Sequence, residues 1–305
     1  MVYKSVEELI GNTPMVELTK IKEKYGLKST LIAKLESFNP ASSSKDRAVK
    51  NMLDTAEREG KIKKGATIIE ATSGNTGIAL AMLGAVRGYN VVIVMPDSMS
   101  KERIMAISAY GAKIVLTDGA LGMNGAVEKA NELANEIEGA YLLGQFERMS
   151  NPEAHYLTTG PEILKNTEGR VDIFVSTIGT GGTISGTSKY LKEEKASIVT
   201  IGVEPSGSPL ISKGYSGVHK IQGIGANFIP NTLEKEYIDK IITVSDADAY
   251  EYARTLATME GILCGISSGA ALKAAIEVCQ SEEGKTVVVL LPDTGLRYFS
   301  SGLFE

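Results

Sequence analysis

The sequence predicts an α/β protein with two domains, each built on a mostly parallel, twisted sheet that helices flank. Short runs rich in Val, Ile and Leu alternate with longer helical stretches along most of the chain, which is the pattern of repeated βαβ units. Several of these runs are apolar at every position, as expected for strands that are covered on both faces. A chain of 305 residues is also long enough for about two domains of ordinary size.

Strands are expected where aliphatic and β-branched residues follow one another without interruption. The clearest runs are residues 31–35, 67–70, 91–95, 113–116, 172–178, 198–204 and 286–291, with a weaker segment at 140–143. Helical patterns lie between them, over residues 48–59, 78–87, 125–138, 184–194, 247–260 and 270–279. We place a domain boundary within residues 146–152. This gives a smaller domain over residues 40–150 and a larger one over residues 1–39 and 151–305.

Composition excludes several classes of protein. With 32 Lys and Arg against 37 Asp and Glu, the chain is mildly acidic and offers no basic surface for nucleic acid or for an anionic membrane. The N-terminus has no apolar core of a secretion signal, and no apolar run is long enough to span a bilayer. Two cysteines and two histidines build neither a disulfide framework nor a histidine-rich metal site. We therefore expect a cytoplasmic protein without a metal.

Ligands of open α/β sheets bind where a strand ends and a helix begins, and four polar loops occupy such places. The loop 179–183 reads Gly-Thr-Gly-Gly-Thr and suits a phosphate, because glycines let the backbone approach an anion at a helix N-terminus. The dinucleotide fingerprint fails, since Ile184 stands at the third glycine position. Glu204 stands at the end of the next strand, where a dinucleotide site has an acidic residue, so the hypothesis of a nicotinamide site is weakened but not excluded.

The loop 72–77, Thr-Ser-Gly-Asn-Thr-Gly, has four short polar side chains where a helix cap needs one, which favours binding of a carboxylate. A third loop, 42–47, carries Lys45 among hydroxyls at a loop–helix junction. A desolvated lysine in such a place is nucleophilic enough to form a Schiff base. The loop 265–269 matches the Gly-x-Ser-x-Gly nucleophile elbow, but no histidine follows it, so the triad order of hydrolases is not met.

Taken together, these loops resemble one family. A Ser-rich segment ending in Lys-Asp-Arg, then TSGNTG, GTGGT and GISSG, is similar in content and order to the cysteine synthase (O-acetylserine sulfhydrylase) group. The resemblance extends from residues 10–14 to residues 292–295, nearly the whole chain. It implies a pyridoxal 5'-phosphate enzyme of the tryptophan synthase β-like fold, fold type II, with the cofactor in the cleft between two domains.

The resemblance also implies roles for individual residues. Lys45 would carry the cofactor as an internal aldimine and later remove the substrate α-proton, and Asn75 would bind the phenolic oxygen. Ser267 would face the pyridine nitrogen, although Ser268 beside it leaves that assignment open by one residue. The cofactor phosphate would be held by Gly179, Thr180, Gly181, Gly182 and Thr183. The substrate carboxylate would be bound by Thr72, Ser73, Thr76 and Gln145, and the region near the substrate amino group would be lined by Gly223 and Ala226.

The implied reaction is a β-replacement that makes L-cysteine from O-acetyl-L-serine and sulfide through an aminoacrylate intermediate. A serine at the pyridine nitrogen does not keep that nitrogen protonated, and the weaker electron sink favours elimination of a β-substituent. Relatives suggest a homodimer, and some of them bind the C-terminal tail of serine acetyltransferase in the active site.

Departures from the family pattern leave alternatives open. Residues 147–150 read Glu-Arg-Met-Ser where the family usually has Ser-Asn-Pro-Ala. A cation at Arg148 near the carboxylate site would favour a phosphorylated substrate such as O-phosphoserine. Cystathionine β-synthase and serine or threonine dehydratase activities are possible on the same scaffold, but the QGIGA stretch at 222–226 is more typical of sulfhydrylases. A purely non-catalytic binding role is the remaining alternative.

Overall fold

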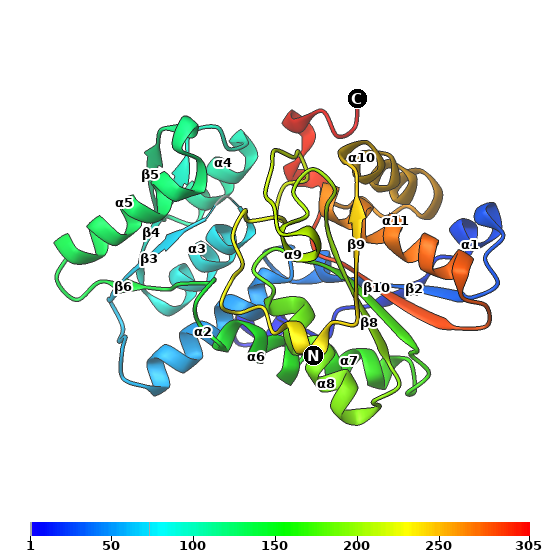
Figure 1. Cartoon of the computed structure of the whole chain (residues 1–305). Helices are drawn as coiled ribbons and strands as arrows, with labels where there is room; N and C mark the ends of the chain where they lie inside the picture. The colour runs from blue at the N-terminus through cyan, green and yellow to red at the C-terminus, as the bar shows by residue number, and fades with distance from the viewer. Residues whose placement is uncertain (1, 73) are drawn as a thin grey trace.

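The computed structural model describes residues 2–72 and 74–305 and contains two sheets (Figure 1). The larger sheet has six strands in the order β1-β2-β10-β7-β8-β9, and β1 alone runs antiparallel to its neighbour. Its strands are β1 (Met15–Glu17), β2 (Thr30–Leu35), β7 (Ile173–Thr177), β8 (Val199–Pro205), β9 (Lys240–Val244) and β10 (Thr286–Leu291). The predicted α/β class with mostly parallel sheets is confirmed.

The smaller sheet has four parallel strands in the order β5-β4-β3-β6. These are β3 (Thr67–Ala71), β4 (Asn90–Pro96), β5 (Lys113–Thr117) and β6 (Tyr141–Leu142). All four lie within residues 67–142, so this sheet is inserted in the chain between β2 and β7 of the larger one. In Figure 1 it lies at the left with α3, α4 and α5 around it. The proposed division at residues 40–150 stays a prediction.

Helices cover both faces of the larger sheet, which is why most positions of its central strands are apolar. In β10, Val287, Val289 and Leu291 pack with residues of α10 and α11, whereas Val288 and Leu290 pack on the opposite face with residues of α7 and α8. This alternation follows from the two-residue period of a strand. The helices are α1 (Thr19–Tyr25), α7 (Thr159–Asn166), α8 (Gly182–Glu194), α9 (Leu210–Lys213), α10 (Asp246–Thr255) and α11 (Ile266–Ser281).

The smaller sheet is covered in the same way. Val91, Ile93 and Met95 of β4 pack into a core with residues of α2 and α3, while Val92 and Val94 face α5. The helices here are α2 (Lys45–Arg58), α3 (Asn75–Arg87), α4 (Lys101–Ala109) and α5 (Gly122–Glu136), and α6 (Ser150–Leu157) packs against α2 and α8. Short 3-10 turns lie at Val6–Leu9, Glu36–Phe38, Gly119–Leu121, Lys235–Tyr237, Gly295–Arg297 and Phe299–Ser301, and a π-helix at Leu256–Glu260 follows α10.

All six predicted helices begin earlier than their apolar pattern indicates, and four of these starts matter for the site. The observed starts are Lys45 for α2, Asn75 for α3, Gly182 for α8 and Ile266 for α11. The reason is that the backbone N–H groups of the first turn have no partner within the helix, so this turn is rich in polar residues that an apolar pattern does not detect. The chemically interesting residues therefore lie in first helical turns rather than in the loops before them.

Several elements carried no recognisable pattern. The strand β1 has only three residues, and β9 is an edge strand with a lysine at its start. The helices α1, α4, α6, α7 and α9 were likewise not predicted, and each has fewer than ten residues. Among the described residues, no helix is long and apolar enough to cross a membrane.

Candidate active site

The N-termini of four helices meet at one pocket of about 410 Å³. It lies beside the carboxyl ends of β7 and β10, where ligands of parallel sheets are expected. Its lining comes from the start of α2, α3, α8 and α11, from the ends of the two strands and from the loop before β9. The residues are Ser44, Lys45, Asn75, Ser176, Thr177, Gly179, Thr180, Gly181, Thr183, Gly223, Ile224, Ser267, Leu290 and Pro292.

The glycine loop is packed too closely to accept side chains. A Cβ at Gly179 would lie 2.4 Å from the carbonyl oxygen of Gly223, and one at Gly182 would lie 2.1 Å from Asn151 Oδ1. Gly181 has a φ of +84°, which glycine adopts without strain. Because the loop leads directly into α8, its backbone N–H groups and the positive end of the helix favour an anion here.

Asn151 and His155, both on α6, hold the two threonines of this loop. Asn151 Nδ2 donates to Thr180 Oγ1 at 3.0 Å and to the carbonyl oxygen of Gln145 at 2.8 Å. His155 Nε2 lies 3.2 Å from Thr183 Oγ1, and its Nδ1 lies 2.9 Å from Thr159 Oγ1. Burial, reinforced by the nearby Arg47 charge, lowers the pKa of His155 to about 3. The imidazole is therefore neutral at physiological pH.

Lys45 is the first residue of α2 and lines the pocket. Burial lowers the pKa of its amine from the ordinary value, against the opposing effect of the carboxylates of Asp293 and Glu36. The neighbouring Asp46 turns away and accepts a hydrogen bond from the backbone of Ala41 at 2.6 Å, and desolvation raises its pKa to about 7. A lysine in this environment keeps a larger neutral fraction than a surface lysine, and the neutral amine is the nucleophilic form.

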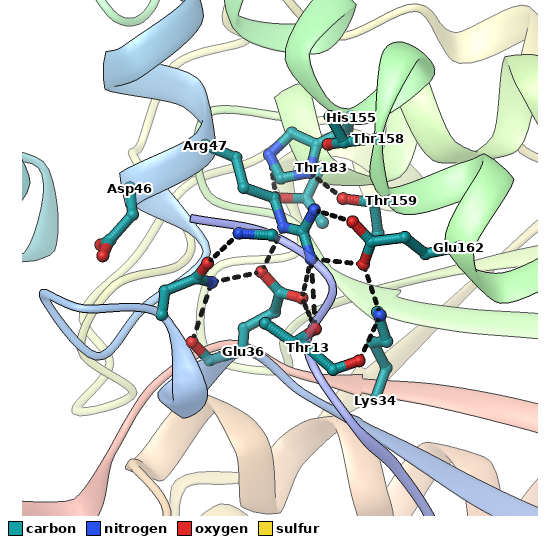
Figure 2. A network of polar contacts seen from close by, with 12 residues as sticks. Thr13, Lys34, Glu36, Asp46, Arg47, His155, Thr158, Thr159, Glu162 and Thr183 are labelled. Carbon is teal, nitrogen blue, oxygen red and sulfur yellow. Dashed lines mark hydrogen bonds and ion pairs between the residues drawn. The ribbon is translucent and has the colours of Figure 1, made fainter. Parts of the chain in front are cut away.

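A buried ionic network fixes the first turn of α2 behind Lys45 (Figure 2). The Arg47 guanidinium pairs with Glu36 at 2.7 Å and with Glu162 at 2.6 Å, and Lys34 pairs with Glu162 at 2.6 Å. Thr13 donates to Glu36 at 2.7 Å. Burial alone would raise the pKa of Glu36, but the charge and hydrogen bonds of Arg47 lower it to about 2. Because Arg47 follows Lys45 by two residues, the network ties the pocket lysine to β2 and α7.

The structure separates the two serines that the sequence left ambiguous. Ser267 lines the pocket, whereas the hydroxyl of Ser268 is fully buried on α11. Asn75 also lines the pocket, and its side chain contacts Asp293 and Arg297 from the C-terminal part of the chain.

The residues expected at the substrate carboxylate are partly brought together. Thr76 Oγ1 donates to Gln145 Oε1 at 2.6 Å, and Thr72 Oγ1 accepts from the backbone of Gly74 at 3.2 Å. Gly223 lines the pocket described above, while Ala226 does not. Ser73 lies outside the described residues.

The structure does not place Arg148 at the pocket of Lys45, so the position that suggested a phosphorylated substrate is not observed. Arg148 Nε donates to the carbonyl oxygen of Leu143 at 2.9 Å, and its guanidinium lies 4.6 Å from the centre of the Tyr141 ring. It lines a separate groove beside α2 and α6 rather than the pocket of Lys45. Arg148 is close to Gln145 in sequence, but the two side chains have different partners: the Gln145 amide contacts Thr76, whereas Arg148 donates to backbone carbonyl oxygens.

Sequence reasoning also gave no role to several buried residues at the site. Asp293, Arg297 and Tyr298 follow β10 and surround Asn75, and no local pattern connects them with a residue more than 200 positions earlier. Glu204 has a purely structural use, because its carboxylate accepts from the backbone of Ile211 and Ser212 at the start of α9. This leaves the nicotinamide hypothesis without its acidic residue.

Comparison with known proteins agrees with this geometry. Residues 6–293 match the family described as pyridoxal-phosphate dependent enzymes. The chain belongs to this family. It is 49% identical to a cysteine synthase of Staphylococcus aureus over 303 residues, which is 99% of this chain and 97% of the relative.

Solved structures of family members superpose over essentially the whole chain. The cysteine synthase of Entamoeba histolytica is 44% identical, with a TM-score of 0.96, and the match covers 100% of this chain and 91% of that one. A hydrogen sulfide-producing enzyme from Fusobacterium nucleatum is 47% identical, with a TM-score of 0.94, covering 98% and 100%. The predicted family, fold and cofactor are thereby confirmed.

The pocket suits the cofactor of the family on its own chemistry. The cofactor has a phosphate, an aldehyde, a phenolic oxygen and a ring nitrogen. The pocket offers a glycine-lined helix N-terminus for the phosphate and a desolvated amine at Lys45 for the aldehyde. The amide of Asn75 and the hydroxyl of Ser267 line the same pocket and are available for the other two groups.

Proposed function

We propose that this chain makes L-cysteine from O-acetyl-L-serine and sulfide, with pyridoxal 5'-phosphate held on Lys45. The observation that carries the proposal is the position of Lys45, a desolvated lysine at one end of a pocket whose other wall is the glycine loop 179–183. The near-complete alignment with cysteine synthases supports the reaction class.

Lys45 is proposed as the catalytic residue. When bound, the cofactor supplies an electron sink that acidifies the α-hydrogen of the amino-acid substrate. The Lys45 amine would be the general base that accepts this proton at Nζ. Its lowered pKa suits the task, because a general base must be unprotonated before it can act.

Residues at the N-termini of the other helices are proposed to hold the phosphate, the ring nitrogen and the phenolic oxygen of the cofactor. Thr180 and Thr183, with the backbone of Gly179, Gly181 and Gly182, bind the phosphate, and the neutral His155 keeps Thr183 in place. Ser267 offers the ring nitrogen a neutral hydroxyl, which suits elimination better than a permanently protonated ring. Asn75 donates to the phenolic oxygen.

The substrate carboxylate is proposed to bind at the start of α3. The hydroxyl of Thr72, the amide of Gln145 and the predicted partner Ser73 supply donors, and the positive end of α3 adds to them. Thr76 contributes by donating its hydroxyl hydrogen to Gln145 Oε1, which orients the Gln145 amide. Gly223 and Ala226 lie in the loop over the amino-group side. Because Arg148 is bound to backbone carbonyl groups elsewhere, we favour the acetyl ester over the phosphoryl ester as substrate.

Three further properties belong to this proposal. A cytoplasmic location is supported by two buried cysteines that form no disulfide. A homodimer and a complex with serine acetyltransferase are supported by the family resemblance alone. The division into domains 40–150 and 1–39 with 151–305 is supported by the separation of the two sheets.

The test is an absorption spectrum of the purified holoenzyme before and after O-acetylserine and then sulfide. We expect a visible band that shifts with O-acetylserine and returns with sulfide, together with formation of L-cysteine. Lys45→Ala should abolish the band and turnover, while the matched variant Lys50→Ala, on the same helix outside the pocket, should keep both. Turnover by Lys45→Ala at the wild-type rate would refute the proposal, and activity only with O-phosphoserine would correct the substrate.

A further inference from the structure

The side-chain amide of Asn75 is held on both sides by residues near the C-terminus. Asn75 Nδ2 donates to Asp293 Oδ2 at 2.8 Å, and Asn75 Oδ1 accepts a hydrogen bond from Arg297 Nη1. A guanidinium can only donate hydrogen bonds, and a carboxylate can only accept them. The pair therefore stabilises one orientation of the amide, because a flipped amide would place N–H against N–H and oxygen against oxygen.

The two clamping residues are themselves fixed. Asp293 is 1% exposed, and its Oδ2 also accepts from the Tyr298 hydroxyl at 2.7 Å. Its carboxylate packs so tightly against Gly265 that a Cβ there would lie 2.2 Å from Asp293 Oδ1. Arg297 Nη2 donates to the carbonyl oxygen of Ala41, in the segment that leads to Lys45. The clamp consequently joins the segments before α2, at the start of α3 and after β10.

Tyr298 keeps the proton that it donates. Burial raises the pKa of its hydroxyl, and the charge of Asp293 raises it further. The hydroxyl and the Asn75 amide thus both donate to the same carboxylate oxygen, and this double interaction holds the carboxylate toward Asn75.

The number of hydrogens on the amide decides what Asn75 can offer to the pocket that it lines. An amide nitrogen has two hydrogens, and one of them is used by Asp293. The other is the donor left for a group in the pocket, and a phenolic oxygen of a bound cofactor needs such a donor. In the flipped orientation Asn75 Oδ1 would face the carboxylate oxygen of Asp293, and no amide N–H would be left on that side for the pocket.

We propose that Asp293 and Arg297 are positioning residues that orient the Asn75 amide, so that its second Nδ2–H serves the phenolic oxygen of pyridoxal phosphate. The inference rests on the proposed function, including the role of Asn75. It gives Asp293 and Arg297 a task at the cofactor, although neither of these two residues lines the pocket.

The experiment compares absorption spectra of holoenzyme variants. A hydrogen bond to the phenolic oxygen sets the ratio of the visible to the near-ultraviolet band, since it acts on the tautomer of the bound cofactor. Asp293→Asn removes the pure acceptor, and Arg297→Lys keeps the charge but loses the planar fork. We expect each to change the band ratio about five-fold in the direction of Asn75→Ala, which corresponds to about 1 kcal/mol for one hydrogen bond.

The matched control is Asp172→Asn. Asp172 accepts from the backbone of Thr286 at 3.0 Å and pairs with Lys195, far from the pocket, so its variant should lower the thermal midpoint without moving the band ratio. An unchanged ratio in Asp293→Asn and Arg297→Lys, with only a lowered midpoint, would reduce the clamp to a structural role and overturn the inference.

The remaining outcomes separate failure of the inference from failure of the proposed function. If Asp293→Asn does not fold, Arg297→Lys tests the same amide from its other side. If the wild-type protein shows no visible band after pyridoxal phosphate is supplied, the proposed function fails and the inference with it. A normal wild-type band with no response in any clamp variant defeats the inference alone.

Discussion

Replacing Arg47 by Met should destabilise the fold strongly at neutral pH and much less in acid. Arg47 is the main cation facing Glu36, and both side chains are almost completely buried. Removing one partner of a buried ion pair costs about 3–5 kcal/mol, because the remaining charge loses its compensation. We expect a loss of this size at pH 7 for Arg47→Met.

The acid dependence follows from the pKa of Glu36. Its pKa is lowered from 4.5 to about 2, and each pKa unit corresponds to about 1.4 kcal/mol, so the interval represents roughly 3 kcal/mol. A lowered carboxyl pKa contributes stability that is present above pH 4.5 and is lost as the pH falls toward 2. The difference between wild type and Arg47→Met should therefore shrink by roughly this amount over that range.

The assay is urea-induced unfolding, followed by circular dichroism at several pH values between 7 and 2.5. Lys50→Met is the control, because the Lys50–Asp54 pair on the same helix is about one-third exposed and contributes under about 0.5 kcal/mol. Adding Glu36→Gln to Arg47→Met should recover part of the loss, since the uncompensated charge disappears. An equal loss at pH 7 and pH 3 would refute the electrostatic reasoning and assign the effect to packing.

Three further predictions concern other buried groups. Gly182→Ala should weaken cofactor binding at least ten-fold, because the new Cβ would displace Asn151. Spectroscopic titration with pyridoxal phosphate measures the affinity. Adding Asn151→Ala should restore stability but not affinity. Glu70, whose pKa burial raises to about 7, opposes folding progressively between pH 4.5 and 7, so Glu70→Gln should gain thermal stability relative to wild type at pH 8 but not at pH 4. His155, with a pKa of about 3, makes wild-type stability fall as the pH drops from 6.5 toward 3, and His155→Gln should lack that part of the slope.

Much of the fold follows from sequence because the central strands are apolar on both faces. In β10 every position after Thr286 is aliphatic, and the turn after the strand carries glycine and hydroxyl residues. The pocket residues were found for the same reason, since loops after strands and before helices are few. What local patterns missed was short, such as β1, or marginal, such as the edge strand β9.

The buried charges could not be predicted in the same way. Glu36 and Arg47 look like ordinary surface residues until β2, α2 and α7 are brought together, and Asn75 meets Asp293 only through the tertiary fold. Arg148 is the converse case, because it is near Gln145 in sequence but contributes to a different surface. Pairings across hundreds of residues leave no periodic signal in a single sequence.

The place of β10 in the larger sheet has a consequence for biosynthesis. Residues Thr286 to Leu291 pair with Thr30 to Leu35 on one side and with β7 on the other, so this central strand is synthesised after both of the strands that it joins. The smaller sheet, complete by residue 142, can form much earlier. Until β10 inserts, β2 and β7 each have an open edge that needs protection from other chains. The pocket also lacks the lining from Leu290 and Pro292 until then, so it is complete only after β10 has been synthesised and has joined the sheet.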